Sequence, residues 1–243
     1  MHRALAKLSL EPLDLVVSLL LVLLFSIAWT VALPGVCRFW NYLFVAGTNF
    51  LGLQARTGLI EHHFTSYVHF VIPYPQIQDA VPGSWMWWTT AAIVLALFAA
   101  SFLFSEKYLP VAYLLRTVLF VQATALLYFA WLPGRFSHTA DSYIGGLVNY
   151  GITLISFVPI LFGLIYYIFD FGLVRKTLVT FLTMSHLCLF IPLQVLLQAI
   201  VLQKSALFMP VLYIVFGLPV DVLIVIAFYS WGMSWNTKAE KLV

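Results

Sequence analysis

Six long apolar stretches decide what this chain can fold into. Each has the roughly 20 residues that an α-helix needs to cross about 30 Å of membrane hydrocarbon. Backbone polar groups inside a bilayer must find partners within the protein, so such stretches cross as helices. The expected spans are residues 13–33, 85–104, 108–132, 144–169, 178–202 and 207–232.

The composition supports this interpretation. Hydrophobic residues make up 63% of the 243 residues and charged residues only 9%, whereas a soluble domain carries about 25% charged residues. The mean hydropathy is +1.01. These values exclude a soluble globule, a disordered chain and a nucleic-acid-binding protein. We predict an all-α polytopic helical bundle, with six transmembrane helices in a single integral membrane domain over residues 1–243.

The positive charges predict that both termini lie inside. An even number of spans places the termini on the same side, and Lys and Arg are enriched in short inner loops. With the N-terminus inside, the inner segments hold Arg3, Lys7, Lys107, Arg175, Lys176, Lys238 and Lys241. The outer segments then hold Arg38, Arg56, Arg135 and Lys204. We expect a multi-pass protein of the cell membrane, with a bacterial cytoplasmic membrane favoured.

Residues 34–84 form a long segment that is expected to lie outside the membrane. Its first part, residues 36–53, is nearly as apolar as a span but also carries Arg38, Asn41 and Asn49. We interpret this part as a helix lying in the outer interface, where amphipathic helices bind. A re-entrant helix packed inside the protein is the alternative.

Residues 64–72 are β-branched and aromatic, and Pro73 and Pro75 are expected to end the run, a pattern typical of a short extended segment. His62 and His63 come just before it, next to Glu61, and His69 lies within it. Metal ligands on one helix need a spacing of four, as in HExxH, and adjacent histidines point in different directions. We therefore expect headgroup or backbone contacts here, with no metal and no cofactor.

The second outer loop, residues 133–143, adds further candidates for chemistry. It holds Arg135, His138 and Asp141. A His and an Asp three residues apart suggest fragments of a hydrolytic site, but GxSxG is absent, and Pro-Gly before polar residues is typical of a plain turn. The candidate catalytic residues of an outward-facing site are His62, His63, Arg135, His138 and Asp141.

Three ionisable residues stand out deep inside the expected spans. Arg116, His186 and Asp221 lie about 12–16 Å from the inner ends of their spans. Unpaired charges are costly at such depth and indicate function by default. We expect a buried pair of Arg116 and Asp221, with His186 able to bridge them. The alternative is a site for a proton, an ion or an anionic headgroup.

The fifth span carries a polar stripe that extends this intramembrane network. Gln194 and Gln198 are four residues apart, and Pro192 should kink the helix beside them. In the sixth span, Gly217 and Pro219 come just before Asp221. Broken helices beside polar groups are how many transporters build sites near the membrane midplane. Glutamines that only hold helices together are the other interpretation.

These patterns favour a multi-pass membrane subunit of a larger complex that serves transport or export. Its partners would be membrane lipids and other membrane proteins, and no nucleic acid. One alternative is a membrane-embedded enzyme acting on a lipid or lipid-linked substrate at the outer face. The other is a stand-alone transporter or channel. No catalytic signature in the sequence decides whether the protein is an enzyme.

Overall fold

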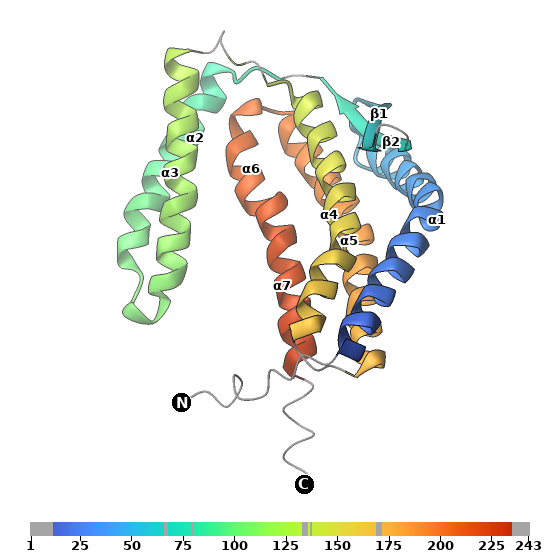
Figure 1. Cartoon of the computed structure of the whole chain (residues 1–243). Coiled ribbons are helices and arrows are strands. Elements are labelled where there is room, and N and C mark those ends of the chain that lie inside the picture. The colour runs from blue at the N-terminus through green and yellow to red at the C-terminus, as the bar shows by residue number, and fades with distance from the viewer. Residues whose placement is uncertain are drawn as a thin grey trace. The chain divides into compact units, whose positions relative to one another are not determined.

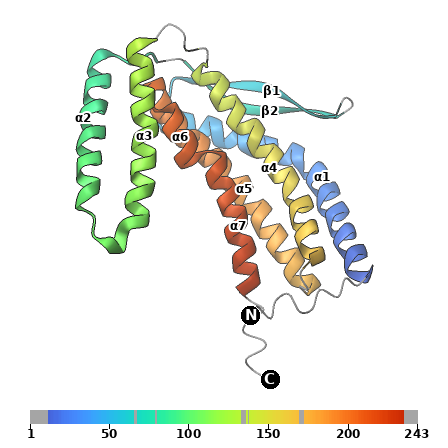
Figure 2. The same cartoon turned by 60° about the vertical axis from the view of Figure 1, so that its left-hand side comes forward.

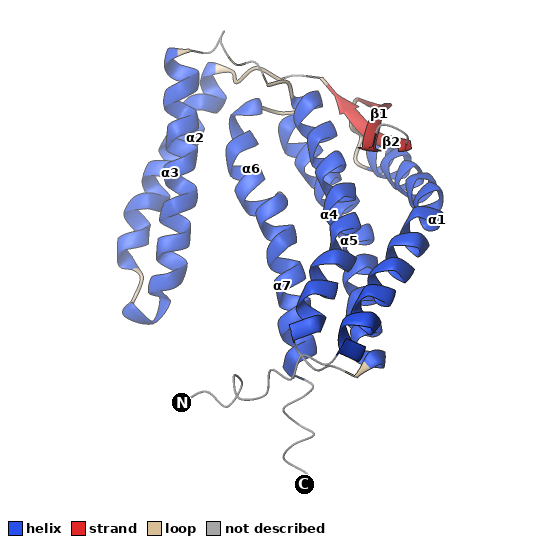
Figure 3. Cartoon of the chain, in the orientation of Figure 1, coloured by secondary structure: helices blue, strands red, loops and turns tan. Residues whose placement is uncertain are grey.

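The computed structural model describes residues 12–65, 68–78, 80–132, 136, 138–168 and 172–234. Over these residues, α-helices dominate and one β-hairpin accompanies them (Figures 1 and 3). The helices are α1 (Pro12–Phe50), α2 (Ser84–Ala100), α3 (Leu109–Trp131), α4 (Ala140–Ile168), α5 (Leu173–Leu202), α6 (Met209–Phe216) and α7 (Leu218–Ser234). The strands are β1 (Ala55–Thr65) and β2 (Val68–Ile77), and three 3-10 turns are η2 (Ser101–Leu103), η3 (Glu106–Tyr108) and η5 (Ala206–Phe208).

Six helical segments of the described chain are long and apolar enough to cross a membrane, as predicted. They are Leu15–Phe50, Ser84–Leu103, Glu106–Trp131, Ala140–Tyr166, Leu173–Leu202 and Ala206–Gly232. The last five agree with the expected bounds to within about five residues, which is the usual accuracy of helix ends read from sequence. The protein is therefore a multi-pass membrane protein.

The first helix departs from the prediction. α1 has 39 residues and continues through Pro34 to Phe50, so the expectation of a separate helix starting at residue 36 was wrong. Proline removes one backbone hydrogen bond, but leaving the helix in apolar surroundings would expose several more backbone groups. At 1.5 Å per residue, α1 is about 58 Å long. The interfacial placement of its last residues stays a prediction.

Residue contacts divide the chain into two compact units. The first unit comprises the chain up to Phe39, Tyr150–Ile191 and the chain from Asp221 onward. The second comprises Trp40–Asn149 and Pro192–Val220. The boundaries fall inside α1, α4, α5 and α7 rather than in linkers. The single membrane domain stays a prediction.

In the first unit, α1 packs closely on α4. Gly163 makes this possible, because a Cβ atom there would lie 2.1 Å from the Cγ2 atom of Val22. The indole N–H of Trp29 donates to the hydroxyl of Ser156 at 2.8 Å. Small residues and single polar contacts of this kind are how helices associate where no water drives them together.

In the second unit, α2 and α3 form an antiparallel helical hairpin (Figure 2). Its buried core holds Val94, Leu119, Ala125, Leu126 and Leu207. The indole N–H of Trp87 donates to the Leu126 carbonyl at 2.9 Å, which joins α2 to α3. The Gln122 amide donates to the Leu207 carbonyl at 3.2 Å, which joins α3 to η5.

The expected extended segment is part of a longer β-hairpin (Figure 2). The strands pair antiparallel from Ala55 opposite Ile77 to Thr65 opposite Val68. Pro73 and Pro75 lie inside β2 and do not end it, contrary to expectation. Proline fits within a strand whose missing N–H faces a free edge, and a two-stranded hairpin has such an edge on each strand.

Candidate functional site: a break in the sixth span

The main candidate site is the break between α6 and α7. α6 ends at Phe216, and Gly217 is extended, with φ −111° and ψ −160°. In a regular helix the Val220 N–H would donate to Phe216, but it donates to the Gly217 carbonyl at 3.0 Å. Pro219 has no N–H to continue the helix. Gly217 is eleven residues from Ala206, or roughly 17 Å along the span, so the break lies near the middle of the apolar segment Ala206–Gly232.

Glycine is required at residue 217, because main-chain atoms of Tyr213 lie where a side chain would begin. A Cβ atom at this position would lie 2.3 Å from the carbonyl oxygen of Tyr213 and 3.0 Å from its carbonyl carbon. Atoms of the main chain cannot move aside as a flexible side chain can. The break therefore depends on glycine at residue 217.

Gln198 on α5 satisfies the carbonyl that the break releases. Its amide N–H donates to the Phe216 carbonyl, and its amide oxygen accepts from the hydroxyl of Tyr143 at 2.7 Å. Only 1% of Gln198 is exposed. An unpaired carbonyl in hydrocarbon costs several kcal/mol, so this contact stabilises the broken span. Tyr143 fixes which end of the amide faces the break.

Gln194 lies one turn before Gln198 on the same face of α5. Only 6% of its surface is exposed, and its amide nitrogen meets no hydrogen-bond acceptor within the described chain. Leaving a buried donor unpaired costs about 1–3 kcal/mol. α5 thus carries one satisfied and one unsatisfied amide, both after Pro192, which lies inside this continuous helix.

The other three intramembrane candidates fall in two different units of the chain. Arg116 belongs to the second unit, whereas His186 and Asp221 belong to the first. The His186 ring lies 5.3 Å from that of Phe190 and 5.2 Å from that of Phe228. Phe228 is seven residues past Asp221, or about 10 Å along α7. The network of Arg116, His186 and Asp221 stays a prediction.

Asp221 lies in the first turn of α7 and is 6% exposed. A carboxylate at this end of a helix is favoured by the helix dipole. The break therefore supplies a local reason for an acidic residue at this depth, since it creates a new helix N-terminus there.

At the expected outer face, Asp141 binds the hairpin. The Tyr74 hydroxyl donates to one carboxylate oxygen of Asp141 at 3.1 Å, while the other oxygen is buried without a donor in the described chain. Gly58 pairs with Tyr74 across the strands. A Cβ atom at Gly145 would lie 3.4 Å from Ile60 and 3.6 Å from the Tyr74 ring. Tyr74 thus packs between Gly58 and the start of α4.

Of the remaining outer candidates, the structure describes the side chain of His138 alone. The His138 ring is 6.0 Å from that of Phe136. Arg135 lies outside the described residues, as do the side chains of His62 and His63, whose backbone forms part of β1. The described residues contain no group of three or more His, Cys, Asp or Glu that could hold a metal ion.

The contact between Tyr74 and Asp141 should make the hairpin sensitive to alkaline pH. Partial burial, the nearby Asp141 charge and the hydrogen bond to that carboxylate all raise the pKa of Tyr74 above its usual value. A raised pKa stabilises the folded state below the ordinary tyrosine pKa of about 10. That stabilisation is lost as pH rises through the higher folded pKa.

We therefore expect Tyr74 to ionise above pH ~10. The measurement is the tyrosinate absorbance of the wild type minus that of Tyr74→Phe. Asp141→Asn should bring the pKa of Tyr74 back toward the ordinary value, because the carboxylate charge is gone. A difference titration at or below the ordinary value would contradict the contact.

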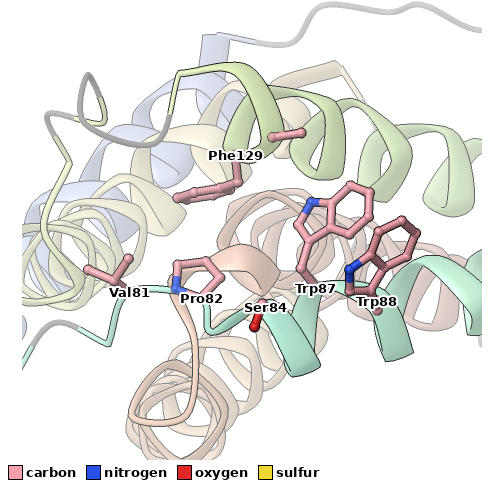
Figure 4. A pocket seen from close by; sticks show the side chains of 7 residues that line it. Val81, Pro82, Ser84, Trp87, Trp88 and Phe129 are labelled. Atoms are coloured by element: carbon pink, nitrogen blue, oxygen red, sulfur yellow. The ribbon is translucent and has the colours of Figure 1, made fainter.

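An apolar pocket of about 430 Å³ lies at one end of the α2–α3 hairpin (Figure 4). Its lining is Val81, Pro82, Ser84, Trp87, Trp88, Phe129 and Ala130. The Trp87 and Trp88 rings meet edge to face, with centroids 4.8 Å apart. Tryptophans at the end of a span are typical of the membrane interface. The apolar lining of this pocket therefore suits contact with lipid better than contact with water.

Taken together, the fold and the break define a multi-pass membrane protein with a discontinuous sixth span. No protein-family model, curated protein or solved structure matches the chain. The class therefore rests on the geometry of the chain itself.

Sequence reasoning missed two tyrosines. Tyr143 binds Gln198, and Tyr74 binds Asp141. The signal for Tyr74 was the glycine opposite it across the strands, because an aromatic ring commonly covers a glycine there. Tyr143 offered no comparable signal, since its partner is 55 residues away.

Proposed function

We propose that the protein is a multi-pass membrane subunit of a larger complex that serves transport or export across the membrane. The observation that carries the proposal is the break at Gly217 with Gln198 on its free carbonyl. Discontinuous helices at membrane depth are tolerated where they are buried or line a path. They are recurrent at the binding sites of transporters.

Gln194 gives the proposed path a contact for its cargo. Its buried amide nitrogen has no acceptor within the described chain, and it lies one turn from Gln198. A group with a hydrogen-bond acceptor, such as a hydroxyl or carbonyl of a passing solute, would satisfy it. Neutral amides suit an uncharged polar group better than an ion, because they carry no net charge.

The helix α2 supports the subunit part of the proposal. Its principal contact in the described chain is with α3, and only 11% of its most apolar window is buried. Trp85, Leu95 and Trp88 are 80%, 71% and 67% exposed. Such a face needs lipid or the helix of another protein against it.

Specific observations support two alternative functions. A stand-alone transporter would use the same break. An enzyme acting on a lipid or lipid-linked substrate at the outer face would use Asp141, whose second oxygen is buried without a donor, together with the exposed His138 three residues earlier.

Native mass spectrometry of the protein, extracted gently from its own membrane, tests the proposal. We expect at least one further membrane protein to be present in a fixed stoichiometric ratio. A lone chain that transports a solute in vesicles would contradict the subunit and favour the stand-alone transporter. A lone chain with a discrete bound lipid that it converts would favour the enzyme.

The control for this experiment is a single substitution on α5. Gln194→Leu removes the unpaired amide but leaves α2 unchanged, so the complex should still assemble while transport is lost. Loss of assembly in this variant would contradict the proposal that the transport path and the contact with other subunits use different parts of the protein.

A further inference from the structure

The guanidinium of Arg116 is held in place at the α2–α3 turn. Its Nε donates to the Ser101 hydroxyl at 3.0 Å, and its Nη2 donates to the Ser101 carbonyl at 3.1 Å. Ser101 is 1% exposed, and its own hydroxyl donates to the Phe98 carbonyl at 2.7 Å. Two hydrogen bonds therefore tie the guanidinium to Ser101.

This position is closer to the membrane boundary than the backbone of Arg116. The residue is ten positions into the span that begins at Glu106, which is about 15 Å by helix rise. Its side chain points back toward the helix N-terminus. Ser101 precedes Phe104 by three residues, or about 6 Å at the rise of a 3-10 helix. Arg116 thus snorkels to the level of the turn.

Two aromatic rings flank the guanidinium. Its central carbon lies 4.3 Å from the ring centroid of Phe102 and 5.6 Å from that of Tyr113. These two residues are 63% and 59% exposed. The charge is therefore part of the outer surface of the helical hairpin, among side chains that face the surrounding lipid.

The remaining donors of Arg116 have no partner in the described chain. Arginine has five N–H donors, and two are used by Ser101. No described carboxylate bonds to the guanidinium. Lys107, at the tip of the turn, adds a second exposed positive charge, and its Nζ lies 5.8 Å from the ring centroid of Tyr108. Glu106 is the one acidic residue of this turn, so a net positive charge remains.

We propose that Arg116 is a binding site for the phosphate of an acidic phospholipid, with Lys107 adding attraction. A planar guanidinium binds phosphate through two parallel N–H donors, and Phe102 and Tyr113 offer apolar contact to the acyl chains. In the predicted orientation the turn faces the inner leaflet, where acidic lipids attract basic residues. The proposal uses that orientation and is independent of the proposed function.

The test uses the full chain in detergent and native mass spectrometry, with phosphatidylglycerol and phosphatidylcholine of identical acyl chains as probes. We expect the wild type to retain phosphatidylglycerol about five- to tenfold more strongly than phosphatidylcholine. Arg116→Gln should abolish this preference. Arg116→Lys should keep part of it, because the charge remains but the two-pronged geometry is lost.

Arg38→Gln is the matched control, since Arg38 is an exposed arginine on α1, where its Nε donates to the Pro34 carbonyl. This variant should keep the preference for phosphatidylglycerol. Ser101→Ala is the second variant should Arg116→Gln fail to fold. It removes one anchor of the guanidinium and should weaken the preference.

Three results would overturn the proposal. The first is an unchanged lipid preference in Arg116→Gln or, where that variant does not fold, in Ser101→Ala. The second is displacement of phosphatidylglycerol by inorganic phosphate at equal concentration, which would identify free phosphate as the ligand. The third is a strong coupling of stability between Arg116→Gln and Asp221→Asn in a double-mutant cycle, which would assign the guanidinium to Asp221.

Discussion

Replacing Gly217 with alanine is expected to destabilise the protein by on the order of 3 kcal/mol, among the larger effects of single substitutions. The added Cβ would meet the main-chain carbonyl of Tyr213 at 2.3 Å, so the break would have to open or the span would have to straighten. Straightening would also remove Phe216 from Gln198. A thermal melt of the detergent-solubilised protein measures the effect.

Gly35→Ala is the matched control, because it makes the same chemical change elsewhere in a span. Gly35 lies inside α1 with nothing within 4 Å of an added Cβ. Alanine there should stabilise the protein by about 0.5–1 kcal/mol, since glycine is a poor helix former. Equal melting temperatures for the two variants would contradict the close approach at Gly217.

The second large effect is a pair of identical substitutions with opposite signs. Gln198→Leu should destabilise the protein by about 2 kcal/mol, because it leaves the Phe216 carbonyl and the Tyr143 hydroxyl without their partner. Gln194→Leu should stabilise it by about 1 kcal/mol, because it removes a buried donor that has no acceptor. Both melts are made under the same conditions.

Transport or export activity is the second measurement to make on these two variants. Gln194→Leu should lose activity while its melting temperature rises, which is the trade-off expected of a residue retained for a ligand. An active and stabilised Gln194→Leu would assign Gln194 to helix packing alone. Loss of stability in both variants would mean that Gln194 also has a partner in the folded chain.

Much of the fold could be predicted from the sequence, because apolar length is a local property. Residues 85–104 and 207–232 read as spans without any knowledge of their neighbours. The end of α1 could not be read in this way. Pro34 and the polar residues after it resemble a boundary, but the cost of exposing backbone in apolar surroundings continues the helix to Phe50.

The candidate site was predictable only in its parts. Gln198 and Gly217 stood out as polar and helix-breaking residues, yet their joining through the Phe216 carbonyl depends on tertiary contact. The depth of Arg116 was read from its backbone, whereas its side chain returns to Ser101. Lys176 was counted among the charges of the inner segments, but it lies within α5 and only 1% of its surface is exposed. Spacing along the chain carries none of this information.

The two prolines of β2 have a consequence for how copies of this protein can meet. Pro73 and Pro75 are two residues apart, so both present a missing N–H to the same edge of the strand. A neighbouring strand could not form a continuous hydrogen-bond ladder along that edge. Growth of the hairpin into a larger intermolecular sheet is therefore limited to the free side of β1, and the ribbon resists stacking edge to edge when the protein is crowded in a membrane.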